Sequence, residues 1–452
     1  MEKNSIDYSI KKNPSMLFVV AFLAVILVGA TLLNFPFSSA DGKSIGFIDA
    51  LFTSTSAVCV TGLATVVTAE YWTIVGKVII LLLIQVGGLG IMTLSTLITL
   101  FLGKRISLKT RMLIKEERNS DDLQGVVRVT KNVLIYTFTV EFIGALLYMT
   151  VFCREFGVPK GIWYSVFHSV SAFCNAGFDL IGGQSLTPYV ANPIINLTTC
   201  ALIICGGLGF IVVIELIKIR KFSKYSLHTK VVVVMTISLL LIGTILFLAL
   251  EYSNDNTIGG FNFFDKLQAS FFQSVTTRTA GFLTVDLSQI RNATAIIMMI
   301  LMFIGGSSGS TAGGVKVTTV AVVILALYTN ISAKKDINIW KKRISLASIM
   351  KAFTIVGIGF IVIIVVFTLV NVFEVNKNMS FVDLMFETVS AFGTVGLSRN
   401  LTPSLSMASK LIISFTMFVG RVGPLTIATA FAVGKEDKLG NYTYPEGKII
   451  IG

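Results

Sequence analysis

The stretch FETVSAFGTVGL at residues 386–397 decides the fold, because three related stretches occur earlier in the chain. They read FTSTSAVCVTGL at 52–63, FHSVSAFCNAGF at 167–178 and SVTTRTAGF at 274–282. All four stretches share one glycine, namely Gly62, Gly177, Gly281 and Gly396. Successive copies of this glycine are 115, 104 and 115 residues apart. Such recurrence indicates one structural module built four times.

Each stretch lies between long apolar runs. The 452 residues are 54% hydrophobic and only 13% charged, which is more apolar content than a soluble core hides and is typical of a membrane protein. A membrane helix needs about 20 apolar residues, with roughly 17 acceptable. Eight transmembrane spans are predicted, at 16–33, 73–102, 133–153, 194–217, 231–250, 294–328, 352–373 and 411–433.

The basic residues predict the orientation in a plasma membrane. Of the 37 lysines and arginines, 25 lie in the amino terminus, in the carboxy-terminal tail and after the second, fourth and sixth spans. An excess of Lys and Arg marks the cytoplasmic side, so we expect both termini to be cytoplasmic. The net charge of +13 would also suit nucleic-acid binding, but no basic domain stands apart from the apolar runs, which argues against that function.

The four glycine stretches follow short amphipathic runs that are too short to span a bilayer, which predicts re-entrant pore helices and loops. A ring of backbone carbonyls replaces the hydration shell of a cation, and glycine most readily adopts the backbone angles that this requires. Asp49, Asp265 and Asp383 suit the first turns of such short helices, whose carboxyl ends favour cations. The simpler interpretation is four glycine turns that join ordinary helices.

The sixth predicted span contains the sequence GGSSGSTAGG at 305–314, which glycine prevents from forming a good helix. A break at membrane depth has to face water or protein, so we interpret it as a plug in the inner vestibule. Lys316 and Arg421 are charges near or within spans and are therefore functional candidates. The predicted gate is Gly305, Gly306, Ser307, Ser308, Gly309, Ser310, Thr311, Ala312, Gly313, Gly314, Lys316 and Arg421. The VGGLG (86–90) and CGGLGF (205–210) sequences favour close helix packing, and Glu141 is expected to pair with a buried cation.

These residues resemble a known family. VTGL, NAGF, TAGF and TVGL look like degenerate TVGYG loops, and with VGGLG, SLHTK (226–230), TRTAGF and VGRVGP they are similar to the Trk/Ktr/HKT superfamily of potassium transporters, most of all to its bacterial KtrB-type subunits. The resemblance covers the chain from about residue 15 to its end. It implies an all-α integral membrane protein with four repeats of helix, pore loop and helix around one pore. The third loop has Thr277 where the family pattern has proline, and this departure is expected to affect loop rigidity.

The resemblance also implies function and partners. It implies potassium uptake, with Gly62 favouring potassium over sodium, 305–314 as the gating loop and Arg421 hydrogen-bonded to its carbonyls. It further implies a homodimer with one pore per subunit, the tail GKIIIG (447–452) at the dimer interface, and a separate KtrA-like cytoplasmic ring that binds nucleotides. Beyond potassium we expect no covalently bound cofactor, and sodium dependence stays open. The chain itself has no dinucleotide-binding GxGxxG after a predicted strand.

The filter would bind potassium through Val60, Thr61, Gly62, Leu63, Asn175, Ala176, Gly177, Phe178, Thr279, Ala280, Gly281, Phe282, Thr394, Val395, Gly396 and Leu397. The expected organisation is a cytoplasmic amino terminus (1–15), repeat 1 (16–103), repeat 2 with its linker (104–217), repeat 3 with the gating loop (218–330), repeat 4 (331–434) and the tail (435–452).

Three other functions compete with a channel-like pore. An alternating-access secondary cation transporter also has broken helices and midplane sites, but such folds usually show two halves and this sequence shows four quarters. A membrane enzyme is disfavoured because the sequence offers no nucleophile–base pair, metal-ligand cluster or acidic dyad. A purely structural scaffold would not need four matched glycines.

Overall fold

A computed structural model describes residues 14–90, 126–333, 336–377 and 379–431. The described chain is mostly helical, with one hairpin of two short strands, β1 (Asn338–Ile339) and β2 (Lys342–Arg343). Three parts of the predicted organisation lie outside the described residues: the amino-terminal residues 1–13, residues 91–125 with the end of the second predicted span and the linker that begins at 104, and the whole 435–452 tail, including GKIIIG.

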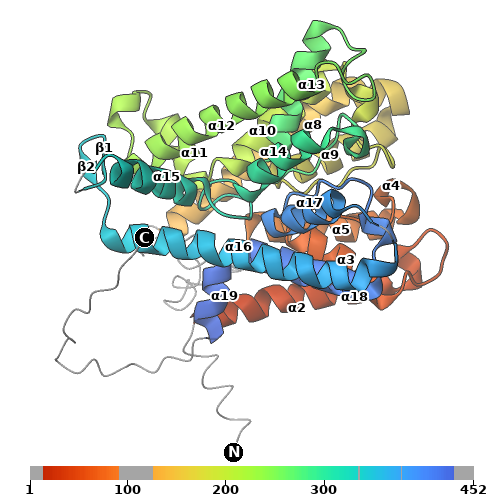
Figure 1. The fold of residues 1–452 in the computed structure, drawn as a ribbon. Helices are drawn as coiled ribbons and strands as arrows, with labels where there is room; N and C mark the ends of the chain where they lie inside the picture. Colours follow the sequence, from red (N-terminus) through yellow and green to blue (C-terminus); the bar gives the residue numbers. More distant parts are fainter. Residues whose placement is uncertain (1–13, 91–125, 334–335, 378, 432–452) are drawn as a thin grey trace, which may run out of the picture.

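The helices follow one order four times: a long helix, a short helix and a second helix of 12 to 16 residues, which in the last three units is followed by a further helix (Figure 1). The first two units are α2 (Pro14–Asn34), α3 (Phe47–Val58), α5 (Ile74–Leu89), and α8 (Val126–Phe156), α9 (Val158–Phe173), α10 (Pro193–Gly207), α11 (Phe210–Lys218). The last two are α12 (Leu227–Glu251), α13 (Phe263–Thr276), α14 (Asn292–Phe303), α15 (Val317–Ile331), and α16 (Leu346–Glu374), α17 (Phe381–Gly393), α18 (Met407–Val422), α19 (Pro424–Phe431). One further helix, α4 (Thr68–Tyr71), follows the first glycine stretch.

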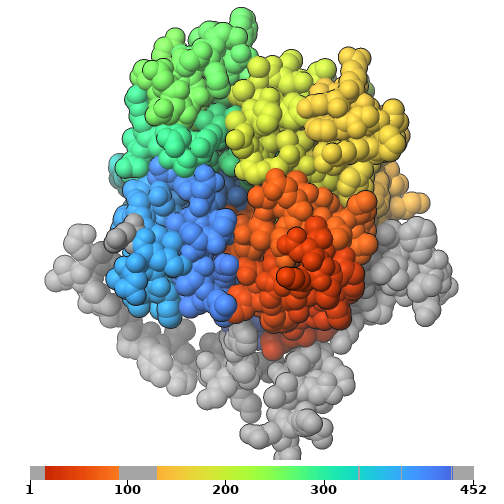
Figure 2. Space-filling model, turned by 90° about the vertical axis from the view of Figure 1, so that its right-hand side faces the viewer, coloured from red at the N-terminus to blue at the C-terminus, as the bar shows by residue number. Residues whose placement is uncertain are grey.

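Successive quarters of the chain lie around a common centre, as the colours in Figure 2 show. Among the described helices, α2, α8, α12 and α16 are long and apolar enough to cross a membrane, and the pair α10–α11, bent by 102°, would be a fifth span if counted as one. The other predicted spans contain shorter helices, so the eight-span arrangement stays a prediction. The apolar faces of α12 and α16 are largely exposed, as expected for helices that meet lipid.

The short helices form the centre of the bundle, and their buried faces are unusually polar. Serines on three of them donate hydrogen bonds to the long helix of the same unit: Ser54 Oγ to the Ile26 carbonyl at 2.7 Å, and Ser274 Oγ to the Leu240 carbonyl at 2.8 Å. Ser169 makes the same bond to the carbonyl of Glu141 at 2.5 Å. A glycine three residues further along each long helix leaves room for the serine; these glycines are Gly29, Gly144 and Gly243.

Candidate functional site

Each short helix ends in the same unusual backbone turn. Two residues before the shared glycine, a non-glycine residue has a left-handed φ between 50° and 67°. These residues are Val60, Asn175, Thr279 and Thr394. The shared glycines then have φ values of 98°, 69°, 78° and 85°. Left-handed φ is unfavourable for L-residues, so the same strained path in four loops indicates that the surrounding structure imposes it.

Hydrogen bonds orient the residue that lies between these two positions. In the first, second and fourth loops its N–H donates back to the short helix: Thr61 to Ser56 and Ala176 to Ser171, each at 2.8 Å, and Val395 to Ser390 at 2.9 Å. The third loop makes the related bond from Ala280 N to the Thr276 carbonyl at 3.0 Å. These N–H groups therefore point toward the short helices, and the carbonyls are left to point the other way.

The four loops meet in a closed ring. A Cβ on Gly62 would lie 2.6 Å from the Ala176 carbonyl oxygen, and one on Gly177 would lie 2.8 Å from the Ala280 carbonyl oxygen. A Cβ on Gly281 would lie 2.7 Å from the Val395 carbonyl oxygen, and one on Gly396 would collide with that of Thr61. Each glycine thus faces the carbonyl of the next loop until the fourth returns to the first. Glycine is required here by both φ and space.

The last residue of each predicted filter set lies differently. Leu63, Phe178, Phe282 and Leu397 have buried side chains. The carbonyls of Phe178 and Phe282 accept hydrogen bonds from Ser171 and Thr276 of the short helices, at 2.6 and 2.7 Å. In these two loops the fourth residue therefore braces the turn against its short helix, and its carbonyl is turned away from the ring.

A cavity of about 180 Å³ lies against the ring and is lined by all four glycines. Asp179, just beyond the second loop, is its only acidic residue among the described lining residues. Its carboxylate accepts hydrogen bonds from the backbone N–H groups of Ile181 and Gly182, at 3.1 and 3.3 Å. Burial of this carboxyl nevertheless raises its pKa to about 6.

The predicted gate, 305–314, crosses between α14 and α15 as an irregular segment. Two backbone hydrogen bonds hold its ends together: Gly305 N donates to the Val315 carbonyl at 2.9 Å, and Val317 N donates to the Gly306 carbonyl at 3.0 Å. A Cβ on Gly313 would collide with the Thr394 side chain, and Thr311 Oγ1 is 3.4 Å from the Phe173 carbonyl oxygen. The segment therefore lies directly against the ends of the short helices and the start of the fourth loop.

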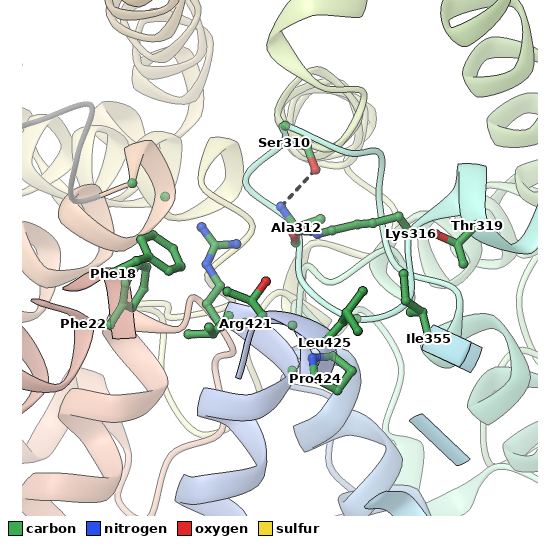
Figure 3. A pocket seen from close by; sticks show the side chains of 18 of the residues that line it. Phe18, Phe22, Ser310, Ala312, Lys316, Thr319, Ile355, Arg421, Pro424 and Leu425 are labelled. Atoms are coloured by element: carbon green, nitrogen blue, oxygen red, sulfur yellow. Dashed lines mark hydrogen bonds between the residues drawn. The ribbon is translucent and has the colours of Figure 1, made fainter. Parts of the chain in front are cut away.

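Two cations and two neighbouring units hold this segment. Arg421, from α18, donates to the carbonyls of Thr311 and of Gly87, the latter on α5. The Nζ of Lys316 donates to the Ala312 carbonyl at 2.6 Å. Figure 3 shows Arg421 and Lys316 converging on Ala312 from two sides. The predicted contact between Arg421 and the carbonyls of the segment is therefore present in the structure.

Backbone contacts extend this anchoring around the segment. The N–H groups of Ser307 and Thr311 donate to the carbonyls of Gly207 and Gly206 at the end of α10, at 3.0 and 3.3 Å. On another side, Gly314 N donates to the Gly420 carbonyl of α18 at 3.2 Å. The segment is thus bonded to the second helices of the second and fourth units, and Arg421 links it to α5 of the first.

Sequence reasoning missed the role of Arg278. This residue lies two positions after the end of α13 and is only 6% exposed. Its Nη1 donates to the carbonyls of Ile304 and Gly305 at 3.1 and 3.3 Å. Its own carbonyl accepts a hydrogen bond from Asn175 Nδ2 at 3.2 Å. Arg278 therefore joins the third loop to the start of the 305–314 segment. The signal was available, because a buried arginine beside a filter sequence needs partners.

The glycine-rich sequences in the other second helices have two roles. Close packing is confirmed, because a Cβ on Gly87, Gly206 or Gly420 would collide with the last carbonyls of the neighbouring short helix. Three residues later, at or just beyond the end of each helix, lies a glycine with left-handed φ, namely Gly90, Gly209 or Gly423. A further helix follows directly in the second and fourth units, whereas in the third unit the 305–314 segment separates the two helices. The expectation of one broken helix was thus too narrow.

Glu141 does not pair with a cation as expected. Its carboxylate accepts a hydrogen bond from Gln85 Nε2 at 3.1 Å and has no ion pair within the described chain. The sequence does not show that Gln85, one residue before VGGLG on α5, lies beside Glu141 on α8.

Comparison with known proteins agrees with this architecture. Residues 3–441 match the TrkH family, whose description is cation transport protein. The chain is 40% identical to the Ktr system potassium uptake protein B of Bacillus subtilis, with 100% of both chains covered. It is 41% identical to the potassium/sodium uptake protein NtpJ of Enterococcus hirae, with 97% of both covered. The potassium transporter TrkH of Vibrio parahaemolyticus has a similar fold, with a TM-score of 0.71 at 18% identity over 92% of this chain and 84% of that one. The chain belongs to the TrkH family of cation transport proteins.

Proposed function

We propose that this protein carries potassium into the cell across the plasma membrane through the ring of four glycine loops. The closed ring carries the proposal: each shared glycine faces a carbonyl of the next loop, with the N–H groups turned back toward the short helices. Convergent carbonyls replace the water shell of a dehydrated cation. The names of the two full-length relatives favour potassium as the ion. Eight spans, four re-entrant loops and cytoplasmic termini belong to the same proposal.

The filter test uses serine at Gly62 and Gly281. A side chain at either position is strained by its φ and collides with the neighbouring loop, which displaces carbonyls from the ring. Since left-handed φ costs an L-residue about 1–2 kcal/mol, we expect the ratio of potassium to sodium uptake in vesicles to fall roughly tenfold.

The matched control is Gly357→Ser on α16, where a Cβ meets nothing within 4 Å. It should leave the uptake ratio unchanged. If both loop variants reach the membrane and keep the parent ratio, the ring is not the selectivity filter.

The 305–314 segment is proposed as the gate beneath this filter. The support is its position against the loop ends and the two cations that hold its carbonyls. A cytoplasmic nucleotide-binding ring of separate KtrA-like subunits is the proposed regulator, in keeping with relatives named as parts of a Ktr system. The proposed functional unit is a homodimer joined through the 447–452 tail, and removal of these six residues should convert it to monomer in size-exclusion chromatography with light scattering.

A further inference from the structure

Arg399 lies just beyond the fourth glycine loop, three residues after Gly396. The residues on either side of it, Ser398 and Asn400, line the cavity of about 180 Å³ that lies against the ring, whereas Arg399 is not among the described residues of that wall. Its side chain is only 9% exposed. A buried guanidinium needs several acceptors, so this side chain is directed into the protein beside the entrance to the ring.

The acceptors come from two neighbouring units. Arg399 Nε donates to the Leu287 carbonyl at 3.0 Å. Its Nη2 donates to the carbonyls of Ser288 and Ile290 at 3.2 and 3.3 Å. These three carbonyls belong to the segment that follows the third loop. The Nη1 of the same side chain is 2.6 Å from the carboxylate of Asp383, in the first turn of α17 in its own unit.

We infer that Arg399 is a positioning residue for the third and fourth loops of the ring, a role that rests on the proposed filter function, and that Asp383 cancels its charge at the entrance. The third and fourth units are neighbours around the centre (Figure 2), and their loops meet where Gly281 faces the Val395 carbonyl. Arg399 is four residues beyond Val395, and it holds a segment that begins six residues beyond Gly281. Its planar guanidinium, fixed by three carbonyls, therefore sets how closely these two loops approach.

The charge of Arg399 acts separately from its hydrogen bonds. A fixed positive charge beside the entrance repels an approaching cation, and a carboxylate at 2.6 Å removes most of this repulsion. Three carbonyls hold the guanidinium independently of Asp383, so loss of that carboxylate alone exposes the charge and leaves the spacing of the loops in place. Entry of potassium and discrimination against sodium thus depend on different partners of one side chain.

The test measures initial rates of potassium and sodium uptake into vesicles that contain the full-length protein. Arg399→Gln removes the charge-assisted hydrogen bonds to the third unit, and we expect the potassium-to-sodium ratio to fall about tenfold. Arg399→Lys keeps the charge beside Asp383 but not the planar fork, so the KM for potassium should stay at its parent value while the ratio remains low.

Asp383→Asn tests the charge balance, because it keeps the shape of the side chain and removes its charge. We expect the KM for potassium to rise about fivefold at low ionic strength, with the potassium-to-sodium ratio near its parent value. Added choline chloride should reduce this rise by screening. When Asp383→Asn is combined with Arg399→Gln, the KM should return toward the parent value because both charges are gone. Loss of a merely structural contact would not be rescued in this way.

The matched control is Lys410→Gln. Lys410, on α18, pairs at 2.6 Å with Asp49, which lies 13 residues before Gly62 as Asp383 lies 13 before Gly396. This pair also joins two units, but within the described chain its ammonium donates to no carbonyl that follows a glycine loop. Both the potassium-to-sodium ratio and the KM of Lys410→Gln should match the parent.

Two sets of results would overturn the inference. If Arg399→Gln keeps the parent ratio, or if Lys410→Gln lowers it equally, Arg399 does not position the loops. If Asp383→Asn leaves the KM unchanged, or if the double variant does not restore it, the charge balance is wrong. A ratio that falls in the Gly62 and Gly281 variants but not in Arg399→Gln rejects only this inference, whereas a ratio kept in all of them rejects the proposed filter.

Discussion

The glycine ring and the helix breaks beyond it are built from the same four repeats but differ in symmetry. In the ring, all four loops have the same pair of left-handed residues and the same contact with the next loop. At the ends of the second helices, three units have a single glycine with left-handed φ, whereas the third has the whole 305–314 segment. A fourfold ring treats an ion equally from every side, while an obstruction needs only one element. Under the proposed function, selection is shared by four repeats and obstruction is assigned to one.

Deletion of residues 305–314 is the strongest test of this difference between the ring and the segment. Gly305 N already donates to the Val315 carbonyl, and Ile304 pairs with Val315, so the deletion joins backbone that lies side by side. We expect potassium flux into vesicles without any partner to rise about tenfold or more, since the open state of a gated protein is often populated at roughly 0.1–10%. The potassium-to-sodium ratio should stay near its parent value.

The direction of the change in flux after this deletion separates a gate from a simple kink in the helix. A segment that only kinks the helix would lose flux when deleted, because packing against Gly206, Gly207 and Gly420 would be lost. Lower flux in a variant that folds and dimerises would therefore show that the third repeat does not carry the gate.

Arg278 sharpens the comparison, because it belongs to both regions. Arg278→Gln should alter the uptake ratio and raise the flux, since the side chain holds Ile304 and Gly305 while its backbone lies in the third loop. Loss of charge-assisted hydrogen bonds worth about 1.5–3 kcal/mol gives an expected change in flux of roughly tenfold. Arg421→Gln, which contacts the segment and not the ring, should raise flux and leave the ratio unchanged.

Paired measurements of flux and of sodium competition in the same vesicles would check this. Arg278→Lys keeps the charge but not the planar fork, so it should restore the flux only in part. Identical effects of Arg278→Gln and Arg421→Gln on the uptake ratio would contradict a link between loop and segment.

The smallest expected effect concerns Asp179 at the outer cavity. Its pKa is raised to about 6, so the carboxylate is charged above this pH and neutral below it. A raised pKa means that ionisation costs folded-state stability, and any attraction of cations is gained only as pH rises through about 6. We expect potassium uptake at low concentration to rise a few-fold between about pH 5 and pH 7, because Asp179 is half-buried beside a cavity and solvent screening limits its attraction to roughly 1 kcal/mol or less. Uptake by Asp179→Asn should lack this step, and a step that persists in the variant would assign the titration to another group.

Much of this arrangement could be predicted from the sequence. The four glycines and the 305–314 segment were predicted because each is a local pattern, and Arg421 was singled out as a charge out of place, but its contact with the segment carbonyls was implied by the family resemblance. The left-handed glycines Gly90, Gly209 and Gly423 were not predicted, because a glycine that allows close packing and one that reverses φ look alike in a sequence. The partners of Arg278 were missed because they are backbone carbonyls, which no residue type announces. The neutral partner of Glu141, Gln85, was missed because a buried carboxylate is usually expected to pair with a cation, and nothing in the sequence distinguishes Gln85 from other amide side chains.

The pinched base of the 305–314 segment has a kinetic consequence. The bonds between Gly305 and Val315 and between Gly306 and Val317 hold the two ends of the segment together, so the proposed gating role implies that residues 307–313 move as a flap on this base. Loop motions of this kind take nanoseconds to microseconds, whereas concerted helix displacements take microseconds to milliseconds. On this proposal its opening rate is set by the release of carbonyls from Arg421 and Lys316 and by the loss of the backbone bonds to Gly206, Gly207 and Gly420, and not by rearrangement of the bundle. Single-molecule current records should accordingly contain brief closures that are much faster than any response to a regulatory partner.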